Sequence, residues 1–153
     1  MDTDTNPKES LEGIFAAIPV AHAMQIRVAD YAGGVLTLAA PEAPSLNHIG
    51  IAFGGAIECL GTLAGWGLLW LTLDEPDARI VIQHADTTFK APLRGDLTAV
   101  AKLPAMAKWE HFSTQLERHG RARLEIHARI GSGAEPEGAL FRGHYAVALK
   151  QGG

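Results

Sequence analysis

The sequence predicts an α+β protein in which one curved antiparallel β-sheet wraps around a single long helix. Residues 54–73 are apolar on every side, so a helix there must be covered all round. Most of the chain after residue 78 has the β-branched, alternating character of strands, and a hairpin pattern precedes the helix. A strongly twisted sheet can curl around one helix, so the three observations fit one architecture.

The first elements are a short helix and a hairpin. Apolar residues recur at helical spacing in 8–18, where Ser10 is a candidate N-cap and Pro19 ends the helix. Residues 23–31 and 35–40 read as two strands joined by an Ala-Gly-Gly turn, and 41–52 as a loop. We expect residues 1–7 to be a disordered tail and 8–150 to form a single domain, as a chain of 153 residues allows.

The long helix contains more glycine than its stability alone would favour. Each interior glycine costs a helix about 1 kcal/mol relative to alanine. Gly61 and Gly65 lie one turn apart and form a smooth stripe, which we interpret as a place where a strand packs close to the helix backbone.

The segments that follow are interpreted as about five antiparallel strands. The clearest alternates apolar and charged residues throughout 121–130. The expected strands are 79–91, 97–103, 110–118, 121–130 and 140–150.

Composition and charge limit the partners of the protein. The net charge of −4 argues against general nucleic-acid binding. The only cysteine, Cys59, rules out an internal disulfide and suits a reducing compartment. The apolar run 59–73 is shorter than the roughly 20 residues that span a bilayer, and the first ten residues do not resemble a secretory signal. We therefore expect a soluble cytoplasmic protein that neither binds nor spans a membrane.

The block NHIGIAFGGAIECLGTLAGWG resembles a known family. Its Asn47, Phe53-Gly54-Gly55 and Leu63-Ala64-Gly65-Trp66-Gly67 are similar to the pattern of putative thioesterases related to the C-terminal domain of YiiD. The similarity covers residues 20–150 and includes the strand that ends in an aromatic-x-x-Pro sequence and a Gly-Asp turn. The resemblance implies the hotdog fold, a curved sheet around a central helix.

The resemblance also implies a reaction and an assembly. Hotdog thioesterases hydrolyse acyl groups carried by coenzyme A or acyl carrier protein, as homodimers or tetramers with shared sites. No cofactor is expected beyond the coenzyme A of the substrate. Better-studied relatives carry His and an acid where this chain has Phe53 and Thr62.

The helix start is the first candidate catalytic feature. The first turn of a helix exposes unpaired N–H groups and the positive end of the dipole. The amides of Gly54 and Gly55 can therefore polarise a thioester carbonyl and stabilise an oxyanion. The alternative interpretation is that the Gly-Gly pair is a plain turn with no role in catalysis.

Glu58 and Thr62 lie on the same helix face as Gly54. Glu58 is a candidate general base or nucleophile; the alternatives are a structural ion pair with a strand Arg or His, or a hydrogen bond at a dimer interface. Thr62 can orient the attacking water, although such a threonine commonly bonds its own helix carbonyl.

The remaining candidates lie outside the helix. Asn47 is expected to orient the water or thioester, or else to cap its loop, and His48 to bind substrate or lie on the surface. His84 and Asp86 share a strand face, either reaching a partner's site across a dimer or forming an ordinary cross-strand pair. The seven histidines show neither HxH nor HxxxH spacing, so no metal site is expected.

Substrate binding would use charged and aromatic groups. Lys90 and Arg94 flank a turn, and with Arg121 and Arg123 they are candidates for contact with phosphates of coenzyme A, or simply solvated charges. Phe53 is a candidate substrate contact at the helix start.

Three functions remain open at this stage. The leading hypothesis is a homodimeric acyl thioester hydrolase. A hotdog protein that binds acyl-CoA or fatty acid without hydrolysis is the alternative, motivated by Phe53 and Thr62. Enoyl-CoA hydratase-type chemistry normally uses a catalytic histidine that faces an Asp or Glu. It is less favoured here, because His48 is the only loop histidine near Glu58.

Overall fold

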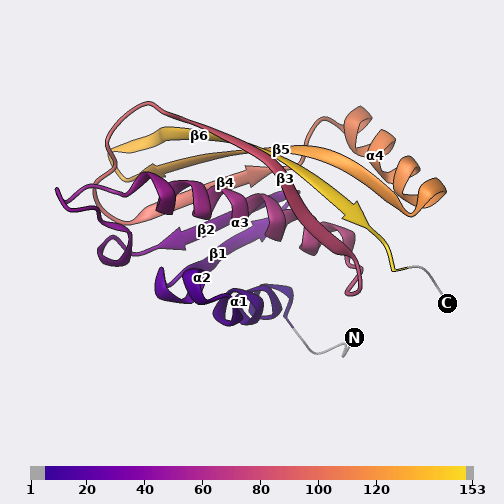
Figure 1. The fold of residues 1–153 in the computed structure, drawn as a ribbon, viewed down its shortest axis with the longest axis horizontal. Helices are drawn as coiled ribbons and strands as arrows, with labels where there is room; N and C mark the ends of the chain where they lie inside the picture. The colour runs from indigo at the N-terminus through magenta and orange to yellow at the C-terminus, as the bar shows by residue number, and fades with distance from the viewer. Residues whose placement is uncertain (1–5, 151–153) are drawn as a thin grey trace.

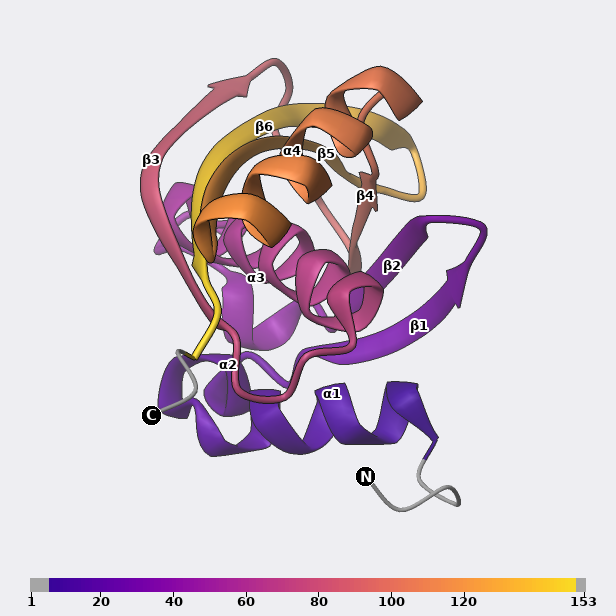
Figure 2. The same cartoon turned by 90° about the vertical axis from the view of Figure 1, so that its right-hand side faces the viewer.

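The protein is a curved six-stranded antiparallel sheet with one long helix in its concave face (Figure 1). The computed structural model describes residues 6–150. Viewed along the long helix, the sheet curls around it while two short helices lie on the open side (Figure 2). The strand order is β1-β2-β4-β5-β6-β3. This arrangement confirms the predicted α+β architecture of a sheet wrapped around one helix.

Two short helices begin the described chain. Helix α1 spans Pro7–Ala17 and is capped by Asn6, whose Oδ1 accepts a hydrogen bond from the Lys8 amide at 3.0 Å. Ser10 lies inside this helix, so its predicted capping role is wrong. Pro19 does end α1, and it then starts α2, Pro19–Ala23, because proline suits the first position of a helix. Of the predicted tail 1–7, residues 1–5 lie outside the described residues.

The predicted hairpin is present as strands β1, Arg27–Ala32, and β2, Val35–Ala40. Its two-residue turn has φ of 59° at Gly33 and 73° at Gly34. Positive φ at both central positions is the type I′ geometry that matches the twist of a hairpin. A 3₁₀ turn, Ala43–Ser45, follows and leads to the central helix.

Helix α3 spans Gly54–Leu73, as predicted. An added Cβ at Gly61 would lie 2.7 Å from the Phe141 ring, and one at Gly65 would collide with the Tyr145 hydroxyl. The Tyr145 hydroxyl donates to the Thr62 carbonyl at 2.7 Å, and burial raises the pKa of Tyr145 well above its usual range. The glycine stripe therefore serves close packing of helix against sheet.

The rest of the sheet consists of β3, Arg79–Phe89; β4, Leu97–Lys102; β5, Arg121–Ser132; and β6, Glu135–Ala148. Between β4 and β5 the chain forms helix α4, Met106–His119, so the predicted strand 110–118 is wrong and four strands follow α3. Phe112 and Leu116 are buried one turn apart, and Gly120 with φ of 70° ends the helix. Helix α4 packs against β5 at one end of the molecule (Figure 1).

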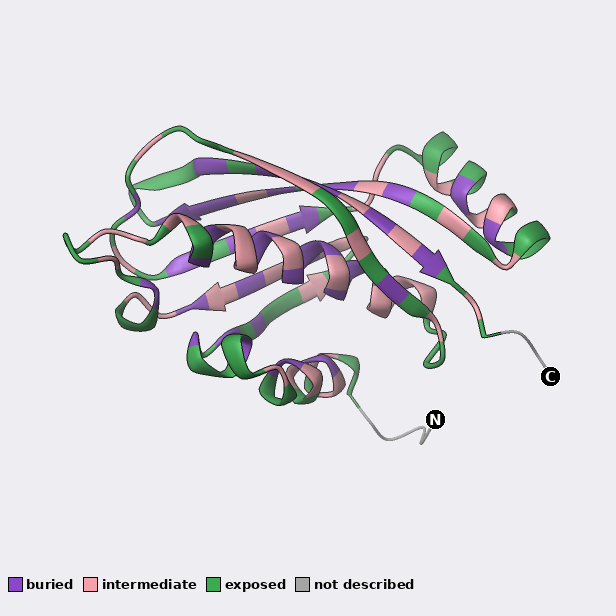
Figure 3. Cartoon of the chain, viewed as in Figure 1, coloured by how far each residue is buried: buried purple, intermediate pink, exposed green. Residues whose placement is uncertain are grey.

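The sheet has an inner face covered by α3 and an outer face free of it. Buried residues alternate with more exposed ones along the strands (Figure 3). On β6, Phe141 and Tyr145 are buried on the inner face, whereas Arg142 is exposed and His144 half-buried on the other face. Strand β3 is the edge strand, joined to β6 alone, and β1 forms the other edge.

Helix α3 is long and apolar enough to cross a bilayer by length and composition. More than half of the tested stretch, 56%, is buried within the molecule. The apolar character of α3 is therefore explained by its place as the core helix of this fold.

Candidate active site

The start of α3 presents two backbone donors without acceptors. Phe53 is the N-cap, with ψ of 133° and no side-chain capping bond, and its carbonyl accepts from the amides of Ala56 and Ile57. Within residues 6–150, the amides of Gly54 and Gly55 donate to no other group. Both donors stand at the positive end of a 20-residue helix, where a developing negative charge is stabilised.

Aromatic rings flank these amides without burying them. A Cβ on Gly55 would lie 2.5 Å from the Phe53 ring, and one on Gly54 would lie 3.6 Å from the Phe89 ring. Gly55 is exposed, and Phe53 and Phe89 are 57% and 54% exposed. In the single chain Gly55 is thus exposed and Gly54 half-buried, beside apolar side chains that themselves lack cover.

The loop before α3 is held by Asn47. Its side-chain Oδ1 accepts hydrogen bonds from the backbone amides of Ile49 at 3.0 Å and Ile51 at 3.2 Å. Its backbone N–H donates to the Ile51 carbonyl at 2.8 Å. The carboxamide oxygen therefore caps the loop, which is the alternative considered for Asn47, and only its side-chain NH₂ remains available to a ligand.

Two further backbone bonds fix where α3 begins. The Phe53 amide donates to the Ser45 carbonyl at 2.7 Å, and the Ala52 amide donates to the Leu93 carbonyl at 2.9 Å. The second bond ties the helix start to the segment after β3. Exposed Lys90 follows Phe89 directly and exposed Arg94 follows Leu93, so both cations lie on segments that adjoin the helix start. His48 is exposed in the loop.

Glu58 has no partner within the part of the chain that is described. Its side chain is partly exposed one turn after Gly54, and no ion pair or hydrogen bond reaches its carboxylate within residues 6–150. A structural pair with a strand Arg or His is therefore absent from the single chain. The carboxylate is free to act on a bound water or to contact a second copy.

Thr62 follows Glu58 on the same face and is also partly exposed. Its carbonyl accepts from Tyr145, whereas its hydroxyl has no hydrogen-bond partner among residues 6–150. Thr72 shows the contrasting behaviour, since its hydroxyl donates to the Leu68 carbonyl at 2.6 Å. The Thr62 hydroxyl thus remains available to a ligand or water.

His84 and Asp86 lie on the outer face of the sheet, opposite α3. Asp86 accepts from Arg142 at 2.8 and 3.1 Å, and His84 lies 3.7 Å from the same carboxylate oxygen. The hydrogen bond from Arg142 lowers the pKa of Asp86 below its usual range. Within one chain these residues form a cross-strand polar group and do not join the helix start.

Other candidate nucleophiles and ligands are less suited to chemistry. Cys59 is partly buried, and this burial raises the pKa of its thiol, which disfavours the reactive thiolate. Across residues 6–150, no three His, Cys, Asp or Glu side chains gather in an arrangement that would hold a metal ion.

The helix start has an apolar rim that was not predicted from the sequence. Leu46 and Ile49 are 38% and 65% exposed in the loop that leads to Phe53. Apolar residues in a polar, proline-containing loop were the available signal. Leu46, Ile49, Phe53 and Phe89 together give this end of the molecule an uncovered apolar surface.

The chain is similar to one known protein family and to several solved structures. The profile of a family described as putative thioesterase, based on the C-terminal domain of YiiD, matches residues 9–149. A protein of unknown function from Chlorobaculum tepidum TLS is 28% identical, with a TM-score of 0.86 and 94% of each chain covered. A putative thioesterase from Shewanella oneidensis is 27% identical, with a TM-score of 0.82, covering 94% of this chain and 98% of its own.

A third match concerns the fold alone. A probable thioesterase from Pseudomonas aeruginosa has a TM-score of 0.82 at 21% identity, over 95% of this chain and 97% of its own. Together with the sheet curled around α3, these matches confirm the predicted hotdog fold.

Proposed function

Because this chain belongs to the family of putative thioesterases related to the YiiD C-terminal domain, we propose that it hydrolyses acyl thioesters of coenzyme A or acyl carrier protein in the cytoplasm. The observation that carries the proposal is the pair of unpaired amides at Gly54 and Gly55 beside a free carboxylate, Glu58. No cofactor is required beyond the coenzyme A of the substrate.

The proposed chemistry uses these groups together. The thioester oxygen accepts hydrogen bonds from the Gly54 and Gly55 amides, which stabilise the negative charge that develops on attack. The Glu58 carboxylate takes a proton from a water that the Thr62 hydroxyl and the Asn47 NH₂ group help to orient. Attack of this water breaks the carbon–sulfur bond and releases the carboxylic acid and the thiol.

A homodimer completes the site in this proposal. The apolar rim of Leu46, Ile49, Phe53 and Phe89 lacks cover in one chain, and the eleven-residue β3 leaves one edge unpaired. Exposed strand edges and apolar patches are features of interfaces. A second copy that pairs along β3 would cover them and exclude water from the helix start.

A second candidate is acyl-thioester binding without hydrolysis. It is favoured by Phe53, which stands where related enzymes carry a polar residue, and by the Asn47 oxygen, which already serves its own loop. In that case the helix amides would hold the carbonyl oxygen and no water would be activated.

Release of free thiol from a panel of acyl-CoAs of different chain lengths tests the proposal. We expect turnover by the wild type and a fall of about 10² or more in kcat for Glu58→Gln, since general-base catalysis contributes about 10²–10⁴. Glu117→Gln is the matched control, because Glu117 is an exposed helical glutamate on α4.

Two outcomes would contradict hydrolysis by Glu58. Full activity of Glu58→Gln would remove the general base from the mechanism. The binding function would be established in its place if the wild type releases no thiol and acyl-CoA raises its melting temperature while remaining intact over hours.

A further inference from the structure

The outer face of the sheet is divided into two regions with different charge balance. Near the middle of β3 its charged groups neutralise one another: Asp86 pairs with Arg142, and Glu125 bonds His127 at 2.7 Å. His144 lies between them, with its ring centroid 5.4 Å from that of His84. These contacts leave little net charge in the middle of the face.

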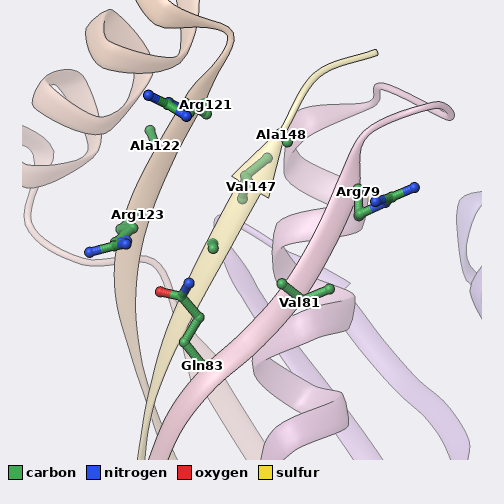
Figure 4. Close-up of a pocket in the computed structure, with 9 residues that line it drawn as sticks. Arg79, Val81, Gln83, Arg121, Ala122, Arg123, Val147 and Ala148 are labelled. Carbon is green, nitrogen blue, oxygen red and sulfur yellow. The ribbon is translucent and has the colours of Figure 1, made fainter.

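The second region, at the start of β3, is basic and unpaired. A hollow of about 520 Å³ lies there, with Arg79 and Val81 of β3 on one rim and Arg121 and Arg123 of β5 on the other (Figure 4). Its floor is β6, which contributes the small side chains of Ala146 and Ala148. We call this hollow the arginine groove.

Three arginines of the groove lack anionic partners. Within residues 6–150, Arg79, Arg121 and Arg123 take part in no ion pair, and the lining contains no Asp or Glu. The nearest acid along the strand, Glu125, is already bonded to His127 and lies 3.8 Å from Arg142. Arg121 and Arg123 share one face of β5 and Arg79 lies two strands away, so like charges gather on this face and their mutual repulsion costs stability.

The strand register sets the spacing of these charges. Arg79 pairs with Ala148, which pairs in turn with Arg121, so the two rims stand two strands apart, about 10 Å. Arg121 and Arg123 are about 7 Å apart along β5. In Figure 4 the guanidinium of Arg79 points away from β6 on one side and those of Arg121 and Arg123 point away from it on the other, with Gln83 between the two rims. Their long stems allow them to close over a ligand on the alanine floor.

From this geometry we propose that the arginine groove binds a phosphorylated small molecule that carries at least two phosphate groups. A single phosphate on the floor reaches one rim, whereas a diphosphate or bisphosphate spans both. Guanidinium groups bind phosphate oxygens in a bidentate manner, which makes arginine the favoured partner for such anions.

The groove is separate from the proposed thioester site of its own chain. Val81 lies eight residues from Phe89, the β3 residue beside Gly54, which is about 26 Å along an extended strand. The groove also lies on the outer face, whereas α3 occupies the inner face. An anion bound in the groove therefore does not compete with an acyl group at Gly54 of the same chain.

Calorimetric titration of the full-length protein with inorganic pyrophosphate, at about 50 mM salt, tests the proposal. We expect one site per chain, at least tenfold tighter binding of pyrophosphate than of inorganic phosphate, and weaker binding at 200 mM salt. The double variant Arg121→Gln/Arg123→Gln should lose at least tenfold in affinity.

Arg129→Gln is the matched control, because Arg129 lies on the same face of β5 outside the groove, 4.0 Å from Glu137. It should bind pyrophosphate as the wild type does. Thermal melting checks folding, and the double variant should be no less stable than the wild type, since it removes repulsion. Equal affinity for phosphate and pyrophosphate, or unchanged binding by the double variant, would overturn the proposal.

Two sources can supply such an anion, and kinetics separates them. This kinetic comparison rests on the proposed hydrolysis of acyl-CoA. If the ligand is the coenzyme A of a substrate held by a second copy, the double variant lowers kcat/KM for acyl-CoA but not for the phosphate-free acyl-N-acetylcysteamine thioester. If it is a separate molecule, both values stay unchanged while pyrophosphate binding is lost. Pyrophosphate binding needs no turnover, so a failure of the proposed hydrolysis leaves this test intact.

Discussion

Gly54 occupies a position at which a backbone donor can be deleted without breaking the helix. It is the first residue of α3, where proline is tolerated because the missing N–H has no partner within the helix. Phe53 already has φ of −69° and ψ of 133°, the conformation that a residue before proline prefers. Substitution by proline therefore tests the amide itself.

We expect Gly54→Pro to fold normally and to lower kcat by about 10²–10³, the usual cost of losing one oxyanion donor. Thiol release from acyl-CoA and thermal melting measure the two effects. Met106→Pro makes the same change at the first residue of α4, far along the chain from the site, and should retain full activity. A kcat for Gly54→Pro within threefold of wild type would show that this amide is not an oxyanion donor.

Unpaired backbone donors could be predicted from the sequence more readily than the partners of side chains. The free amides at Gly54 and Gly55 follow from helix geometry, which a sequence can convey. The cap formed by the Asn47 oxygen does not, because it depends on how residues 47–51 fold back on themselves. Likewise, the alternation of β3 placed His84 and Asp86 on one face, but only the register with β6 identifies Arg142 as their partner.

At the scale of elements, the contact between α3 and β6 depends on the glycine stripe. We expect Gly61→Ala and Gly65→Ala each to destabilise the protein by about 1–3 kcal/mol, because the added methyl group meets the side chains of Phe141 and Tyr145. Chemical denaturation measures the effect.

Gly13→Ala is the contrasting helical substitution. Apart from the neighbouring backbone of its own helix, no atom of the described chain lies within 4 Å of a Cβ at this α1 position, so the substitution should raise stability by about 0.5–1 kcal/mol. Equal effects at Gly13 and Gly65 would show that packing is not what requires glycine in α3.

The polar group on β3, β5 and β6 predicts a pH dependence. Hydrogen bonds lower the folded-state pKa of Asp86, through Arg142, and of Glu125, through His127. Their stabilising contribution is therefore present above the unfolded pKa values near 4 and lost as pH falls through the folded ones. Arg142→Gln should lower the melting temperature at pH 7 and have a smaller effect at pH 2.5. A loss of the same size at both pH values would contradict this origin.

The one misassigned element shows the limit of local patterns. Residues 110–118 alternate well enough to resemble a strand, yet Trp109, Phe112 and Leu116 also follow helical spacing, and Gly120 supplies a helix end. Both periods fit a segment of nine residues. The helix forms because it buries Phe112 and Leu116 against the rest of the protein. The sequence of the segment alone does not contain this information.

At the scale of the whole molecule, the apolar rim and the free edge of β3 predict a dimer. Sedimentation or light scattering should give twice the chain mass of 16.3 kDa. Phe89→Glu places a charge on the rim and should shift the protein toward monomer with loss of thioesterase activity. Met106→Glu, at an α4 residue that is 69% exposed, should leave both unchanged. A wild type that stays monomeric at micromolar concentration would contradict the shared site.

The architecture was predictable because one segment dominates it. A 20-residue helix without a polar face can exist in water only if the rest of the chain surrounds it, and this requirement fixes the curved sheet. The arginine groove could not be predicted in the same way, since Arg79 and Arg121 are 42 positions apart and meet only through the register of β6.

The place of β6 between β5 and β3 has a consequence for how the protein is made. Strand β3 leaves the ribosome long before β6, so the nascent chain carries α3 without its full cover until β6 has been made. Chains that expose apolar segments and unpaired strands during this interval are prone to aggregate. We therefore expect truncation within β6 to yield insoluble protein, and the yield of native protein to depend on chaperones that hold the unfinished chain.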